Sequence, residues 1–387
     1  MARKYSIDDN RRSLTRLAAG SCLVALSLAA CKSEPAPSAT PPSAPEATAT
    51  AKNALTPAPT TPSPTENAGP PGTVRAVSAN GDALQRPTTA AFRGQTLWVS
   101  IGQLGALFTE GGQPKLPFGA VSMTLPAGEL GATVALPGPD YYPEGITAAA
   151  DGTLYIGSIM QGVVSKVPAG STTAEPFVKK GGAKRGVIGL TVDAGRDLLW
   201  FCDSNPKLED AKKAGELVGV KLSDASEVVR HTLPPLDGKA PFCNDVIVSP
   251  SGDLWITDSA GGRLFRVPAD AATKPSTVEA WLTGGEIGAP PSGGSGANGL
   301  EWVDGALIVA NVGRGTLVKL DPASTDPGRG ASVIPLVDAQ TKAPVTLCSP
   351  DGLELVPGTK DKLIVVENGG CNAKTPRISE VTLPARS

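Results

Sequence analysis

The stretch PEGITAAADGTLYIGS, residues 143–158, decides the fold. It consists of a polar residue, a glycine, a short aliphatic strand, an Asp-Gly turn and a second apolar strand. Three later stretches keep the polar residue and both strands: CNDVIVSPSGDLWITDS from residue 243, ANGLEWVDGALIVANV from residue 297 and PDGLELVPGTKDKLIVVEN from residue 350. The chain therefore contains an internal repeat built from short strands.

Two weaker copies keep the strands and lack a strong polar residue. They begin at Ile188 and near Thr88, so the six copies start at residues 88, 144, 188, 244, 298 and 351. Units of about 40–50 residues with several short strands are typical of propeller blades, because one blade cannot bury both faces of its sheet alone. The sequence predicts an all-β fold, a six-bladed β-propeller with four-stranded antiparallel blades and little helix.

The polar residues that open the innermost strands are expected to converge at one mouth of the central channel. They are Glu144, Asn244, Asn298 and Asp351. Four oxygen-bearing side chains on one small ring suit a hard divalent cation. The alternative is structural, because Asn, Asp and Gly also begin strands where the chain turns.

The N-terminus has the features of an export signal. Residues 1–30 join basic residues to an apolar run too short to span a bilayer comfortably. That run ends Leu28-Ala29-Ala30-Cys31, which resembles a bacterial lipobox, so Cys31 is predicted to carry a lipid. The alternative is an ordinary signal peptide with a chance cysteine. We expect an exported protein held on a bacterial membrane, in the periplasm or at the cell surface, through this lipid alone.

The remaining composition defines two further regions. Residues 31–72 are rich in Pro, Ala, Ser and Thr, cannot bury enough apolar surface to order themselves, and are predicted to form a disordered linker. Residues 73–387 are predicted to form the propeller. The full chain has 35 basic and 37 acidic residues, so it has no basic excess to attract nucleic acid. We expect a monomer.

Four cysteines lie in the predicted propeller: Cys202, Cys243, Cys348 and Cys371. Disulfides are expected in an oxidising compartment, and four cysteines allow three pairings. One pairing would close a loop inside the last repeat with Cys348 and Cys371, and would join adjacent repeats through Cys202 and Cys243. A Cys₄ zinc site is the alternative, although the C-x-x-C spacing typical of such sites does not occur.

The order of the ring motifs resembles the senescence marker protein/gluconolactonase (regucalcin-like) family of six-bladed propellers. The resemblance covers roughly residues 73–387 and lies in Pro143-Glu144-Gly145, Cys243-Asn244-Asp245, Ala297-Asn298-Gly299 and Pro350-Asp351-Gly352. It implies one divalent cation, with calcium favoured over zinc. Glu144, Asn298 and Asp351 would be its main ligands, and Asn244 would touch the cation, its water or the substrate.

The resemblance also implies a hydrolase that opens a lactone or a related ester. A cation there would polarise the carbonyl and stabilise the oxyanion, and Asp351 would accept a proton from water, with Asn244 beside it. This chain departs from the family at Phe242, where gluconolactonase-type members place a substrate-binding arginine, and it has a single histidine, His231. The alternative is a non-catalytic propeller lipoprotein that binds a protein or glycan partner and holds a structural cation.

Overall fold

The computed structural model describes residues 70–78, 84–206, 214–369, 371 and 375–385. The predicted signal, Cys31 and most of the linker lie outside the described residues. No helix within the described ranges is long and apolar enough to cross a membrane.

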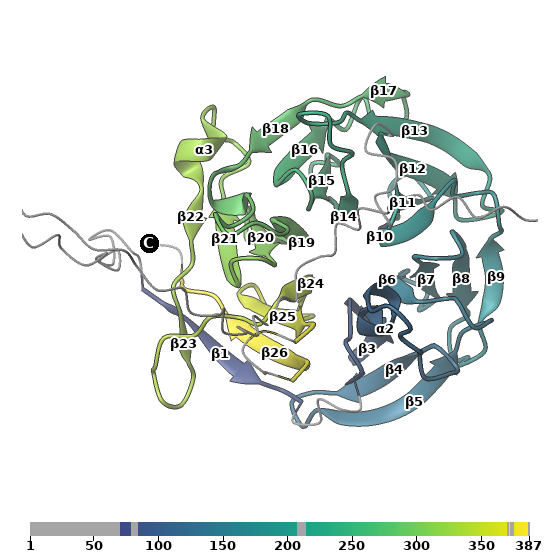
Figure 1. Ribbon diagram of the computed structural model, residues 1–387, viewed down its shortest axis with the longest axis horizontal. Coiled ribbons are helices and arrows are strands. Elements are labelled where there is room, and N and C mark those ends of the chain that lie inside the picture. The colour runs from purple at the N-terminus through teal and green to yellow at the C-terminus, as the bar shows by residue number, and fades with distance from the viewer. Residues whose placement is uncertain (1–69, 79–83, 207–213, 370, 372–374, 386–387) are drawn as a thin grey trace, which may run out of the picture. The chain divides into compact units, whose positions relative to one another are not determined.

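The described residues form six small β-sheets arranged around an axis, as Figure 1 shows. Each sheet is one blade, and its innermost strand follows the repeat found in the sequence. The innermost strands are β2 (Ala90–Arg93), β6 (Pro143–Ala148), β10 (Gly186–Asp193), β14 (Cys243–Val248), β19 (Ala297–Val303) and β24 (Pro350–Leu355). The six-bladed all-β prediction is confirmed.

Blades 1 to 3 continue outward in chain order, with antiparallel neighbours. Blade 3 also gains a short parallel strand, β17 (Ser276–Thr277), from the segment that follows blade 4's third strand. The other strands are β3 (Thr96–Ile101), β4 (Gly119–Thr124), β5 (Glu129–Ala135), β7 (Leu154–Ser158), β8 (Val164–Val167), β9 (Glu175–Val178), β11 (Leu198–Ser204), β12 (Gly215–Lys221) and β13 (Glu227–Leu233).

Blades 4 and 5 have the same four-stranded plan. Among the described residues, the helices are short connections: α2 (Leu104–Phe108), η1 (Gly285–Ile287) and α3 (Pro327–Gly330). The remaining strands of these blades are β15 (Leu254–Asp258), β16 (Arg263–Val267), β18 (Ala280–Thr283), β20 (Ala306–Asn311), β21 (Thr316–Leu320) and β22 (Ser332–Val333).

Blade 6 joins the two ends of the propeller. Its inner strands are β24, β25 (Lys362–Glu367) and β26 (Arg377–Thr382), and its next strand is β1 (Gly72–Ala76), from the start of the folded region. β1 pairs antiparallel with β26 and parallel with β23 (Leu336–Asp338), so the purple and yellow ribbons of Figure 1 lie side by side. This pairing closes the ring, because the first and last parts of the propeller share one sheet.

The hydrophobic core lies between facing blades. Between blades 2 and 3, for example, Tyr155 and Phe177 pack against Leu190 and Leu199. Between blades 4 and 5, Trp255 joins a similar cluster. Each blade buries its apolar faces against its neighbours, so the innermost strands are held firmly at the axis.

Candidate functional site

Five of the six innermost strands contain a β-bulge at the same place. In β6 the pairing with β7 shifts between Pro143 and Ile146, so Glu144 and Gly145 leave the regular ladder. The equivalent shifts occur in β10, β14, β19 and β24. A bulge turns side chains out of the regular alternation and is common beside functional sites. The two residues that open each of these repeats therefore form a bulge, which changes the direction of one side chain in each of the five blades.

The glycine in this dipeptide allows neighbouring innermost strands to approach closely. A Cβ on Gly145 would collide with the Ile188 carbonyl oxygen of the next blade, and one on Gly299 would collide with that of Asp351. A Cβ added to Gly352 would likewise lie only 2.8 Å from the Thr89 Cα. Because these contacts are with backbone atoms, only glycine fits.

The four predicted ring residues are all buried, with 4–7% of their surface exposed: Glu144, Asn244, Asn298 and Asp351. Asn298 lies beside Asp351, and its side chain acts to lower the pKa of that carboxyl. Asn368 Nδ2 donates to Asp351 Oδ2 at 2.9 Å. The Asn298 Oδ1 atom is buried and has no hydrogen-bond partner among the described residues. An unsatisfied buried acceptor beside a carboxylate is a feature that needs a ligand to complete it.

The carboxylates of the ring interact with each other electrostatically. Burial raises the pKa of Glu144 well above its usual range, and the nearby Asp351 and Asp245 raise it further. Burial raises the pKa of Asp351 to about 7, and Asp245 adds to the increase while the hydrogen bonds from Asn368 and Asn298 oppose it. Like charges in a poorly solvated place favour protonation, or binding of a cation that neutralises them.

Three further carboxylates lie beside the ring, and the sequence analysis did not assign them a role. Asp245, Glu301 and Glu354 are half-buried and each accepts a backbone N–H from the next innermost strand, from Leu300, Leu355 and Phe92 respectively. Burial raises the pKa of Asp245 and Glu301 to about 7. No ion pair among the described residues joins a Lys or Arg to these three or to the ring carboxylates.

The sequence did contain a signal for these residues. Asp245 occupies the place that glycine holds after the ring residue in blades 2, 5 and 6. Glu301 and Glu354 lie three residues after their ring residues, in otherwise apolar strands. A charged residue in such a strand indicates a specific partner, since burying it alone is costly.

The raised pKa of Glu301 predicts a pH-dependent stability. A carboxyl whose pKa is about 7 in the folded chain and near 4.5 when unfolded binds more protons in the folded state between those values. The free energy of unfolding should therefore fall as the pH rises from about 4.5 to 7 in the absence of metal. Over this pH range we expect the free energy of unfolding to fall by roughly 1–2 kcal/mol less in Glu301→Gln than in the wild type. Urea denaturation at pH 5 and pH 7.5, with a chelator present, measures it, and an equal pH dependence in the variant would contradict the assignment.

Other polar residues near the strand ends have structural partners. Asp258 Oδ1 accepts the backbone N–H groups of Phe242, Ala260 and Gly261. Asp203 accepts those of Lys184 and Arg185. His231 is buried in β13 and hydrogen-bonded to the Ser276 hydroxyl and the Ala272 carbonyl. These groups cap turns and join strands, so each has a structural role.

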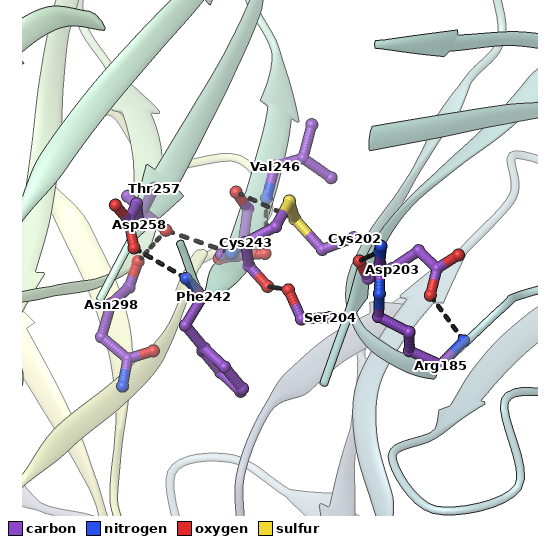
Figure 2. Close-up of a disulfide and its surroundings, with 11 residues drawn as sticks. Arg185, Cys202, Asp203, Ser204, Phe242, Cys243, Val246, Thr257, Asp258 and Asn298 are labelled. Carbon is purple, nitrogen blue, oxygen red and sulfur yellow. Dashed lines mark hydrogen bonds between the residues drawn. A yellow bond between two sulfur atoms is a disulfide. The ribbon is translucent and has the colours of Figure 1, made fainter. Parts of the chain in front are cut away.

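Two disulfides form, between Cys202 and Cys243 and between Cys348 and Cys371. The first joins blade 3 to blade 4 through the residue that precedes Asn244 (Figure 2). In the same view the side chains of Phe242 and Asn298 point in the same direction from neighbouring blades. Phe242 lies two residues before Asn244 and is packed against a hydrophobic core cluster.

The ring residues fit a hard cation better than a soft one. No group of three or more His, Cys, Asp and Glu side chains with metal-binding geometry occurs among the described residues. The ring does not meet that definition, since its donors are two carboxylates and two amides. Carboxylate and amide oxygens are the donors that calcium takes, whereas the nitrogen and sulfur donors typical of zinc sites are not part of the ring.

Taken together, the fold and the ring define a six-bladed β-propeller with a buried polar site at the innermost strands. No family model matches the chain, and no curated protein matches it by sequence. Solved structures with the same fold include a luciferin-regenerating enzyme, at 13% identity and TM-score 0.54, which covers 80% of this chain and 95% of that one.

Two further solved structures share the fold. A calcium-binding protein, regucalcin, from Agrobacterium tumefaciens is 15% identical with TM-score 0.52, and the match covers 77% of this chain and 91% of that one. The Kuenenia stuttgartiensis hydrazine synthase is 13% identical with TM-score 0.52, and the match covers 78% and 84%. At these identities the likeness establishes the propeller fold.

Proposed function

We propose that the ring binds one divalent cation, with calcium preferred over zinc, through Glu144, Asn244, Asn298 and Asp351. The observation that carries this proposal is the buried Asn298 Oδ1, which has no hydrogen-bond partner among the described residues. The Asn298 side chain lies beside the Asp351 carboxyl, and its unpaired oxygen is available as a ligand. A cation would satisfy this oxygen and neutralise the neighbouring carboxylates in a single step.

We further propose that the site serves a metal-dependent hydrolase of the lactonase or esterase type. A bound cation would polarise the carbonyl of the substrate and stabilise the oxyanion that forms on hydrolysis. Asp351 is the proposed proton acceptor, because it lies in the ring beside the proposed cation, which would keep its carboxylate ionised. Asn368 Nδ2 donates a hydrogen bond to Asp351 Oδ2 at 2.9 Å, and this bond fixes the direction of the other carboxylate oxygen.

Phe242 indicates which class of substrate the site would accept. It is half-buried two residues before Asn244, and its backbone N–H is fixed by Asp258 at 2.8 Å. An aromatic side chain there would contact an apolar part of a lactone or aryl ester and offers no charged group for sugar hydroxyls. The same residue favours the second candidate function, a non-catalytic propeller that binds a protein or glycan while the cation is structural. On both candidates we propose an exported chain attached to a bacterial membrane through lipid on Cys31.

Hydrolysis decides between the two candidates. We expect the calcium-loaded chain to hydrolyse an aliphatic lactone or phenyl acetate, and to act at least about tenfold less on a polyhydroxylated sugar lactone. Activity should be lost with a chelator, return with calcium and be absent from Asp351→Asn. A calcium-binding chain with no turnover of any of these substrates would leave the non-catalytic function.

A further inference from the structure

In each of the five blades with a bulge, one position in the second strand lies opposite the bulge of the innermost strand. In blade 4 this residue is Thr257, because Val246 pairs with Ile256 and Cys243 pairs with Asp258. We call it the clamp position. Its occupants in blades 2 to 6 are Gly157, Cys202, Thr257, Ala310 and Val366. In blade 1, where the pairing of β2 has no register shift, the equivalent residue is Ser100, which follows Val99, the partner of Ala90.

Thr257 links two ring strands through one buried hydroxyl. Its Oγ1 donates to the Asn298 carbonyl oxygen of blade 5 at 2.7 Å and accepts the Asp245 N–H of its own blade at 3.1 Å. These are backbone groups that the bulges release from the ladder, and buried backbone groups need partners. The hydroxyl thus fixes the backbone of Asn298 relative to blade 4.

Ser100 acts on Glu144 in the same way. Its Oγ donates to the Glu144 carbonyl oxygen of blade 2 at 2.7 Å, and Thr88 Oγ1 lies 2.8 Å from that oxygen. Both hydroxyls are fully buried. In blade 3 the clamp position is Cys202, whose disulfide holds Cys243, the residue before Asn244 in blade 4 (Figure 2).

The type of residue at the clamp position correlates with whether the next blade carries a proposed ligand. Ser100, Cys202 and Thr257 precede the blades that carry Glu144, Asn244 and Asn298. Gly157 and Val366 have no polar side chain, and the blades that follow them have Ile188 and Thr88 at the ring position. Ala310 precedes Asp351, and there Asn368 of blade 6 binds the carboxylate directly at 2.9 Å.

We infer that Ser100, Cys202 and Thr257 are positioning residues that set the ligand-bearing bulges of the following blades at the spacing a calcium-sized cation requires. The inference rests on the proposed function, since the cation is what the spacing serves. Groups that orient metal ligands from behind typically change affinity about 10–100-fold when removed. The backbone of each ligand is held here, so the effect should appear in calcium affinity as well as in stability.

Calorimetric titration of calcium into the full chain tests this inference with a matched pair. Thr257→Val keeps the shape and removes the hydroxyl, so we expect about tenfold weaker binding. Thr257→Ser keeps the hydroxyl and should bind within about twofold of wild type. Ser165→Ala is the control, because it removes another buried hydroxyl, bonded to Tyr141 at 3.0 Å, that has no contact with the ring. Wild-type affinity in Thr257→Val would overturn the inference and leave the proposed function intact.

Amide hydrogen exchange of the metal-free chain separates this inference from the proposed function. The Asp245 N–H should exchange faster in Thr257→Val than in Thr257→Ser, because only the second variant retains its acceptor. Equal exchange in both variants would overturn the positioning role. A wild-type chain that binds no calcium would instead overturn the proposed function, and the exchange comparison would still show whether Thr257 holds the bulge.

Discussion

Saturating calcium is expected to raise the melting temperature of the wild-type chain by roughly 5 °C and to leave that of Asp351→Asn unchanged. The increase arises because calcium at 100 times its Kd raises the free energy of unfolding by about 2.7 kcal/mol. The substitution removes one of the two ring carboxylates and should lower calcium affinity about 100-fold, or about 2.7 kcal/mol. Differential scanning calorimetry with calcium and with chelator measures both effects.

Glu354→Gln is the matched control for this experiment. It removes a carboxyl from the same axis, and that carboxyl accepts the Phe92 N–H from outside the ring. We expect it to keep most of the calcium-dependent increase. Equal losses in Glu354→Gln and Asp351→Asn would show that overall negative charge, and not the ring geometry, attracts the cation. Asp351→Asn should remain folded, because the burial of Asp351 already disfavours its charged form.

Gly299→Ala is expected to lower the free energy of unfolding by about 3 kcal/mol. Its Cβ would collide with the Asp351 carbonyl oxygen and lie 3.0 Å from Gly352 Cα, so β19 and β24 would have to separate. The separation would also pull Asn298 away from Asp351, and calcium affinity should fall with stability. Urea denaturation and calcium titration on the same sample measure the two effects.

Gly328→Ala provides the comparison for the glycine substitution. Its Cβ would find its nearest neighbour, Asp326 Oδ1, at 3.8 Å, which is ordinary contact. We expect a change within about 0.5 kcal/mol and unaltered calcium binding. If Gly299→Ala behaved like Gly328→Ala, the close approach of the innermost strands would not determine the ring.

The repeat made the fold predictable from sequence, because Asp-Gly turns and paired apolar strands are local signals. The hairpin of β14 and β15 shows this well, since both of its strands lie in CNDVIVSPSGDLWITDS, which the sequence already indicates as a pair of strands. The contribution of β1 to blade 6 was not predictable from such signals. It pairs Val74 with Val381, and no local pattern indicates a partner so distant in the chain.

The ring residues were also predictable as a set, because equivalent positions of a repeat occupy equivalent places around an axis. Their partners were harder to find. Asn368 follows the second strand of blade 6 and reaches Asp351 only through the fold. Thr257 is one of many hydroxyls in the sequence, and its role appears only when the bulge leaves the Asn298 carbonyl without a ladder partner.

Isothermal titration calorimetry of calcium into the metal-free chain at pH 7.5 measures whether the ring is a metal site. We expect one calcium ion per chain, competed weakly by zinc and lost when Glu144→Gln and Asp351→Asn are combined. A wild-type chain that binds no calcium, or a double variant that binds it as tightly as wild type, would show that the ring is not a calcium site.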